Sequence, residues 1–134
     1  MKRLTDWRTR LTTYAQSASA RAFRPGEHDC ALFVAGAVEA LTGKDLAADW
    51  RGTYRTLDEG RAALLASGFQ DQVSLVASVF VEVPPLAAQV GDIAVVPTSQ
   101  GPALGVVQGA RIWVLMPSGL GTVPLTEAEK AFRV

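Results

Sequence analysis

The sequence predicts a single α+β domain over residues 1–134, in which a helical N-terminal half packs on a small antiparallel β-sheet. Apolar residues recur at helical spacing in the first half, and the period then changes to short strand-like runs, of which Ser78–Val83 alternates and is rich in β-branched residues. Helices followed by strands are typical of the α+β class. The length of 134 residues fits one domain, and 49% apolar residues with 19% charged residues favour a packed core over disorder.

Three helices are expected in the first half of the chain. The first spans roughly residues 5–20, where apolar side chains recur at helical spacing. The second spans Cys30–Leu41, with Asp29 in front as the N-cap and Gly43 behind as the C-cap. The third spans about residues 57–67 and opens with the spacing of a capping box, Thr-Leu-Asp-Glu.

Four short strands and a final helix are expected in the second half. The first strand is Ser78–Val83, which alternates and ends at a pair of prolines. The next three are Asp92–Val96, Leu104–Gln108 and Arg111–Met116, and a tight hairpin joins the last two. Thr126–Glu129 has the spacing of another capping box, which predicts a short helix at this point.

The overall charge excludes several classes of partner. The chain has 13 basic and 13 acidic residues, so no global field attracts nucleic acid or an anionic membrane. Apolar stretches are interrupted well before 18 residues, and the first residues contain no apolar run of a secretory signal. We therefore expect no nucleic-acid partner, no membrane span, and synthesis in the cytoplasm without a signal peptide.

Charge is nevertheless distributed unevenly along the chain. Residues 1–24 contain six basic side chains and one acid, a net charge of +5. Residues 83–126 contain only two charged side chains, Asp92 and Arg111. The charge-poor segment is interpreted either as a buried sheet with tight turns or as a surface covered by a protein partner.

The only candidate site in the sequence is the stretch His28-Asp29-Cys30. If Asp29 caps the second helix, Cys30 occupies the first helical position, where backbone N–H groups favour a thiolate nucleophile. A thiol nucleophile usually needs a histidine as its base, and His28 is the only histidine in the chain. The alternative is a small, buried, inert cysteine. One cysteine and one histidine do not suggest a metal site, and no motif predicts a cofactor.

Three stretches together resemble the NlpC/P60 family of papain-like cysteine peptidases. They are Asp29–Val34 (DCALFV), Gly91–Val96 (GDIAVV) and Ala103–Gly109 (ALGVVQG). The resemblance implies a papain-like fold with Cys30 at the position of the nucleophile. Ala103 stands where the family has its catalytic histidine. The third catalytic position falls near Val114 or Leu115, and both are apolar.

A closer resemblance links the chain to small NlpC/P60-like proteins encoded in tail modules of phages, prophages and gene-transfer agents. It is carried by Leu41–Asp45 (LTGKD), Arg51–Arg55 (RGTYR) and residues 119–125 (GLGTVPL). The resemblance implies a structural or accessory component of a tail tip or tail assembly, located in the virion tail. It also implies other tail proteins as partners, with bacterial peptidoglycan as a further partner.

The sequence thus favours a catalytically degenerate peptidase fold that serves as a protein-binding module. An active cell-wall hydrolase that cuts peptidoglycan, with Cys30 as the nucleophile and His28 as an unconventional base, is the main alternative. A binding domain without a phage role, or a regulator that uses Cys30 as a redox sensor, is a third interpretation. The missing histidine at position 103 is the reason for expecting no enzymatic activity.

Overall fold

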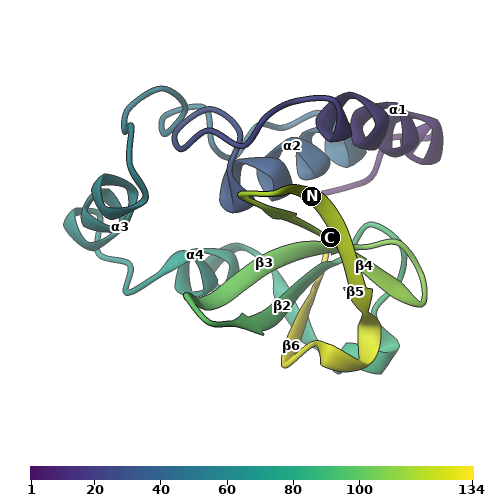
Figure 1. The fold of residues 1–134 in the computed structure, drawn as a ribbon. Helices are drawn as coiled ribbons and strands as arrows, with labels where there is room; N and C mark the ends of the chain where they lie inside the picture. The colour runs from purple at the N-terminus through teal and green to yellow at the C-terminus, as the bar shows by residue number, and fades with distance from the viewer.

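Four α-helices make up most of the N-terminal half of the molecule. The computed structural model describes residues 1–134, and the helices are α1 (Trp7–Ser19), α2 (Cys30–Thr42), α3 (Leu57–Ala66) and α4 (Gln72–Val79). Figure 1 shows α1 and α2 side by side above the sheet, whereas α3 stands apart at one end of the molecule. None of the helices is both long and apolar enough to cross a membrane.

The C-terminal half forms a six-stranded antiparallel sheet, which confirms the predicted α+β class. Its strands are β1 (Val81–Val83), β2 (Ile93–Thr98), β3 (Gly101–Val107), β4 (Arg111–Met116), β5 (Gly119–Pro124) and β6 (Lys130–Arg133). The spatial order is β1-β6-β2-β3-β4-β5, so the last strand lies inside the sheet between the first two. Two short 3₁₀ turns, η1 (Pro85–Ala87) and η2 (Leu125–Glu127), lie in the connections.

The predicted strand at Ser78–Val83 was wrong in its first half. Residues up to Val79 belong to α4, and only Val81–Val83 form a strand. Asp71 caps this unexpected helix, because its carboxylate accepts a hydrogen bond from the backbone N–H of Ser74 at 2.8 Å. Val76 from the same helix is buried in the core. A short apolar run rich in β-branched residues fits either structure, and here packing selects the helix.

The predicted C-terminal helix was also wrong. Only the turn η2 forms there, and the chain then enters β6. Ala131 and Phe132 in β6 are buried, and β6 pairs with β1 on one side and β2 on the other. A capping box starts a helix only where the residues that follow it are not held in another structure, such as a β-strand. The pairing partners of β6 lie 35 or more residues away, so tertiary contacts override the local signal.

The core lies between α2 and the sheet. Its largest fully buried side chains include Phe33 and Leu41 of α2 and Phe132 of β6. Every residue of the segments 93–96 in β2 and 103–107 in β3 is buried. Burial within the sheet therefore accounts for much of the charge-poor segment that the sequence shows.

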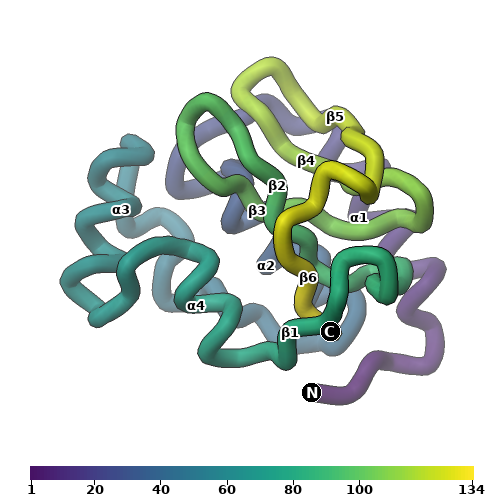
Figure 2. The backbone as a smooth tube through the Cα atoms, turned by 90° about the horizontal axis from the view of Figure 1, so that it is seen from below, coloured from purple at the N-terminus to yellow at the C-terminus, as the bar shows by residue number.

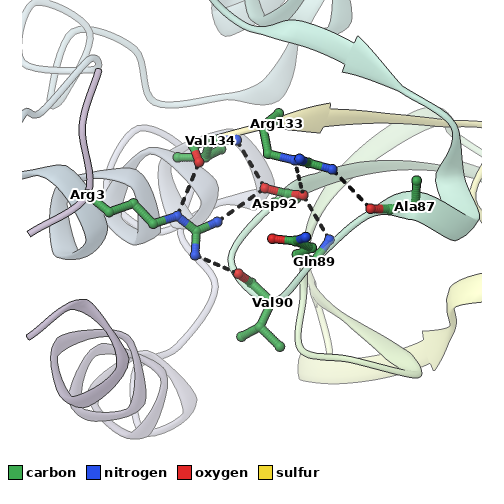
Figure 3. Close-up of polar contacts among 7 residues, drawn as sticks. All are labelled: Arg3, Ala87, Gln89, Val90, Asp92, Arg133 and Val134. Carbon is green, nitrogen blue, oxygen red and sulfur yellow. Dashed lines mark hydrogen bonds and ion pairs between the residues drawn. The ribbon is translucent and has the colours of Figure 1, made fainter. Parts of the chain in front are cut away.

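Asp92 joins both ends of the chain to the start of β2. Its carboxylate is completely buried. Oδ1 accepts hydrogen bonds from Nη2 of Arg3 at 3.2 Å and from the backbone N–H of Val134 at 3.0 Å. Oδ2 accepts from the backbone N–H of Gln89 at 2.8 Å and from Nε of Arg133 at 3.0 Å (Figure 3). Four donors satisfy this carboxylate, so its position serves the fold and not acid catalysis.

The two chain ends consequently lie close together beside β1 and β6, as Figure 2 shows from below. Arg3 Nε also donates directly to the backbone carbonyl of Val134 at 3.1 Å. The guanidinium group of Arg3 lies over the ring of Trp7, 4.3 Å from its centroid. The N-terminal segment is thus fastened to the sheet before α1 begins.

Candidate functional site

Asp29 fixes the start of α2, as the sequence predicts. The Oδ1 atom of Asp29 accepts a hydrogen bond from the backbone N–H of Leu32 at 3.0 Å. Its Oδ2 atom accepts from the hydroxyl of Tyr54 at 2.6 Å and from the backbone N–H of Gly26 at 3.0 Å. Gly26 has a φ of +82°, and a Cβ atom there would collide with the backbone carbonyl of Tyr54. The cap therefore also holds the two loops that flank α2.

The thiol of Cys30 is bonded to the backbone of β3. Its Sγ atom donates to the carbonyl oxygen of Leu104 and accepts from the N–H of the same residue, both at 3.1 Å. These two backbone groups are available because β4 pairs with β3 only at Val106 and Val107. The sulfur thus takes the place of a strand partner at the uncovered part of the β3 edge.

Burial keeps this thiol protonated. The pKa of Cys30 is raised to about 12, chiefly by burial and also by the negative charge of Asp29, whereas the hydrogen bond from Leu104 opposes the rise. The sequence placed Cys30 at the first position of α2, and the structure confirms that placement. The favourable effect of the helix N-terminus on a thiolate is outweighed here by the loss of water.

His28 does not form a dyad with Cys30. The imidazole is buried, and its Nε2 atom donates to the carbonyl oxygen of Ala18 at 3.0 Å, which assigns the proton to Nε2. The ring packs edge-on against Phe33, with centroids 6.4 Å apart. His28 lines a groove between α1 and α2, whereas Cys30 lines a different cleft. No hydrogen bond joins the two residues.

We expect the stability of the protein to fall below about pH 6.5 because of His28. Burial lowers the pKa of His28, so between the two pKa values the unfolded chain binds a proton at this residue more strongly than the folded chain does. The stabilisation is complete above about pH 6.5 and is lost as the pH falls toward the lowered pKa. Urea unfolding at pH 7.5 and 5.5 measures the loss. The His28→Gln variant keeps a donor for Ala18 and should show a smaller loss, and an equal loss in both proteins would contradict this.

No replacement base reaches Cys30 from the neighbouring strands. Ala103, where the resemblance to NlpC/P60 peptidases would lead one to expect a histidine, is buried and lines the same cleft as Cys30. Val114 and Leu115, near the third position, are both buried in apolar clusters. Nucleophilic catalysis by a thiol needs a base within hydrogen-bond reach, and both hydrogen bonds of this sulfur are with the backbone of Leu104.

Cys30 borders a cleft of about 420 Å³ that is lined mostly by apolar side chains. The cleft lies between α2, α3, α4 and the turn between β2 and β3. Leu57, Leu64 and Leu65 of α3 contribute one wall. Gln72 of α4 also lines the cleft, and its amide donates to the carbonyl oxygen of Pro102 at 3.1 Å. This volume falls within the range of ligand-binding sites.

Two residues of this site escaped the sequence analysis, Tyr54 and Gln72. Tyr54 lies 25 residues after its partner Asp29, and Gln72 lies 30 residues before Pro102. The Arg51–Arg55 stretch was noticed only as part of a resemblance, and no local signal marked Gln72. Nowhere do three or more His, Cys, Asp or Glu side chains lie together in a way that could hold a metal ion.

A family model described as "Domain of unknown function (DUF6950)" matches residues 2–134. No curated protein matches the chain.

Proposed function

The chain belongs to the DUF6950 family of domains of unknown function, and we propose that this member is a structural or accessory component of a phage-like tail tip. It uses a catalytically degenerate, papain-like cysteine-peptidase fold to bind another tail protein, and it resides in the virion tail. Bacterial peptidoglycan is a second binding partner of such a component. The resemblance of the motifs supports the location, and the geometry around Cys30 supports the absence of catalysis.

The observation that carries the proposal is the environment of the Cys30 thiol. The sulfur is bonded on both its donor and acceptor sides to Leu104. Ala103 supplies no base, and His28 is committed to α1. General-base assistance is typically worth about 10²–10⁴-fold in rate, so its loss leaves a weak catalyst. Cys30 is accordingly a structural link between α2 and β3.

The cleft beside Cys30 is the surface best suited to a protein partner. Helix α3 has no buried residue, although it carries several leucines. The exposed fraction is 63% for Leu65 and 42% for Leu57. Apolar side chains that remain exposed together beside an apolar cleft are typical of an interaction surface. A partner side chain that enters the cleft would also cover these leucines.

A charged substitution on α3 is expected to remove the protein from the tail. We expect Leu65→Glu to lower incorporation into particles from the strain that encodes the chain at least about tenfold, because a buried carboxylate opposes the apolar contact. Quantitative mass spectrometry of purified particles measures the incorporation. Leu86→Glu is the matched control, since Leu86 is 77% exposed in η1 and lies outside the cleft.

Two outcomes would contradict the proposal. Absence of the wild-type chain from purified particles would exclude a stable tail component. Equal incorporation of the Leu65→Glu and Leu86→Glu variants would exclude the cleft and α3 as the docking surface. Circular dichroism of both purified variants separates a docking defect from a folding defect.

The second candidate is a cell-wall cysteine hydrolase, which one observation favours. Cys30 stands at the N-terminus of α2 and borders a cleft large enough for a ligand. That function requires a thiolate at neutral pH and loss of peptidoglycan cleavage in a Cys30→Ala variant. This candidate would be excluded if the wild type and the Cys30→Ala variant both cleaved peptidoglycan no faster than the background rate without protein.

A further inference from the structure

A second hollow lies on the other side of α2, between α1, α2 and the loop that contains Asp45 and Arg51. It is a groove of about 660 Å³. Unlike the cleft beside Cys30, its lining is mostly polar. The floor contains the buried residues His28, Leu32 and Ala40. The resemblance to cysteine peptidases concerns Cys30 and β3, and it assigns no role to this groove.

Three arginines from separate segments line the groove, and two of them are held in place. Arg10 of α1 donates from Nε to the carbonyl oxygen of Ala40 at 2.7 Å. Arg51 donates from Nε and Nη2 to Asp45 at 2.9 and 3.2 Å. Arg21 makes only one long bond, from Nη2 to the carbonyl oxygen of Glu27 at 3.5 Å. Each guanidinium therefore keeps terminal N–H groups for another acceptor.

The groove retains an excess of positive charge. Its two carboxylates are Glu39 and Asp45, and the latter is already paired with Arg51. Against these two carboxylates stand the three guanidinium groups of Arg10, Arg21 and Arg51. Guanidinium groups bind carboxylates through paired N–H donors. An anionic ligand is thus favoured over a neutral or cationic one.

The groove is too long for a single small anion. Arg10 and Ser17 lie seven residues apart on α1, about 10 Å along its axis, and Arg21 lies beyond them. Hydroxyl groups of Thr13 and Ser17 line the wall between the two arginines. An extended peptide advances about 3.3 Å per residue, so three or four residues span this distance. Because the whole chain carries no net charge, no positive electrostatic field beyond the groove attracts a nucleic acid.

We propose that the groove between α1 and α2 binds an extended acidic segment of a partner protein, whose carboxylates meet Arg10, Arg21 and Arg51. This surface is distinct from the cleft beside Cys30 and does not depend on the proposed tail function. It gives the small domain two separate faces for partners, one apolar and one basic.

Fluorescence anisotropy of a labelled hexaglutamate peptide with the full chain tests this inference. At about 0.15 M salt the Debye length is about 8 Å, so distant charges contribute little. We expect Arg21→Glu to weaken the affinity at least about tenfold, because it replaces a free donor with a like charge. Arg24→Glu is the matched control: Arg24 is exposed, pairs only with exposed Glu27, and does not line the groove.

Three results would overturn the inference. One is no binding of hexaglutamate at millimolar concentration. Another is an equal effect of Arg21→Glu and Arg24→Glu, which would reduce the interaction to general charge. The third is equal affinity for a six-nucleotide single strand with the same dependence on Arg21, which would indicate a general polyanion site. Because none of these measurements involves tail particles or Cys30, their failure leaves the proposed function untouched.

Discussion

An Asp92→Ala variant is expected to lose at most about 3–5 kcal/mol in its free energy of unfolding, the cost typical of removing one partner from a buried ion pair, because Asp92 is fully buried whereas its partners Arg3 and Arg133 keep some contact with water. The substitution leaves the guanidinium groups of Arg3 and Arg133 without their carboxylate. It also leaves the backbone N–H groups of Gln89 and Val134 without their acceptor. Since a typical domain is stable by about 5–15 kcal/mol, this loss removes a large share of the total.

Urea unfolding followed by tryptophan fluorescence measures this loss. Asp58→Ala is the control, because Asp58 also pairs with an arginine, Arg61 at 2.8 Å, but its side chain is 92% exposed. An exposed pair contributes about 0–1 kcal/mol. A loss in the Asp92 variant no larger than that in the Asp58 variant would show that Asp92 does not hold the chain ends to β2.

Local signals in the sequence were sufficient for α2 and for the middle strands. Asp29 and Gly43 cap α2 at its two ends, and Gly43 has the left-handed conformation that such a cap requires. The hairpin between β3 and β4 follows from two short apolar runs joined by a tight turn that contains Gly109. β5 was not predicted, because Gly119–Pro124 contains two glycines and a proline and forms a strand by pairing with β4.

The candidate site was less predictable than the fold. The helix N-terminus at Cys30 was visible in the sequence, and it favours a reactive thiolate. The protonation state of the thiol is set by burial in the folded chain, against β3 groups such as Leu104 that lie 74 residues away. Tyr54 and His28 also take their roles from partners on other elements. A sequence pattern shows which groups are available, but the burial that sets their pKa values arises only in the folded chain.

The second large effect that we expect is a very low reactivity of the single thiol, Cys30, in the folded protein. With burial raising the pKa of Cys30 to about 12, the thiolate fraction at pH 7 is about a thousandfold smaller than in an ordinary cysteine. Alkylation depends on the thiolate and on access to the sulfur. Burial lowers the thiolate fraction, and the hydrogen bonds with Leu104 hold the sulfur against β3. The unfolded protein in guanidinium chloride is a matched control, since the same thiol should then titrate near pH 8.5.

The rate of iodoacetamide alkylation of Cys30 against pH, on the folded protein, tests most directly whether this cysteine is structural. No second thiol interferes, because the chain contains only one cysteine. We expect slow modification that still rises above about pH 9 without a plateau, whereas the unfolded control reaches its plateau. Fast modification with an apparent pKa below about 7 would demonstrate an activated thiolate. That result would contradict the non-catalytic role and favour the hydrolase.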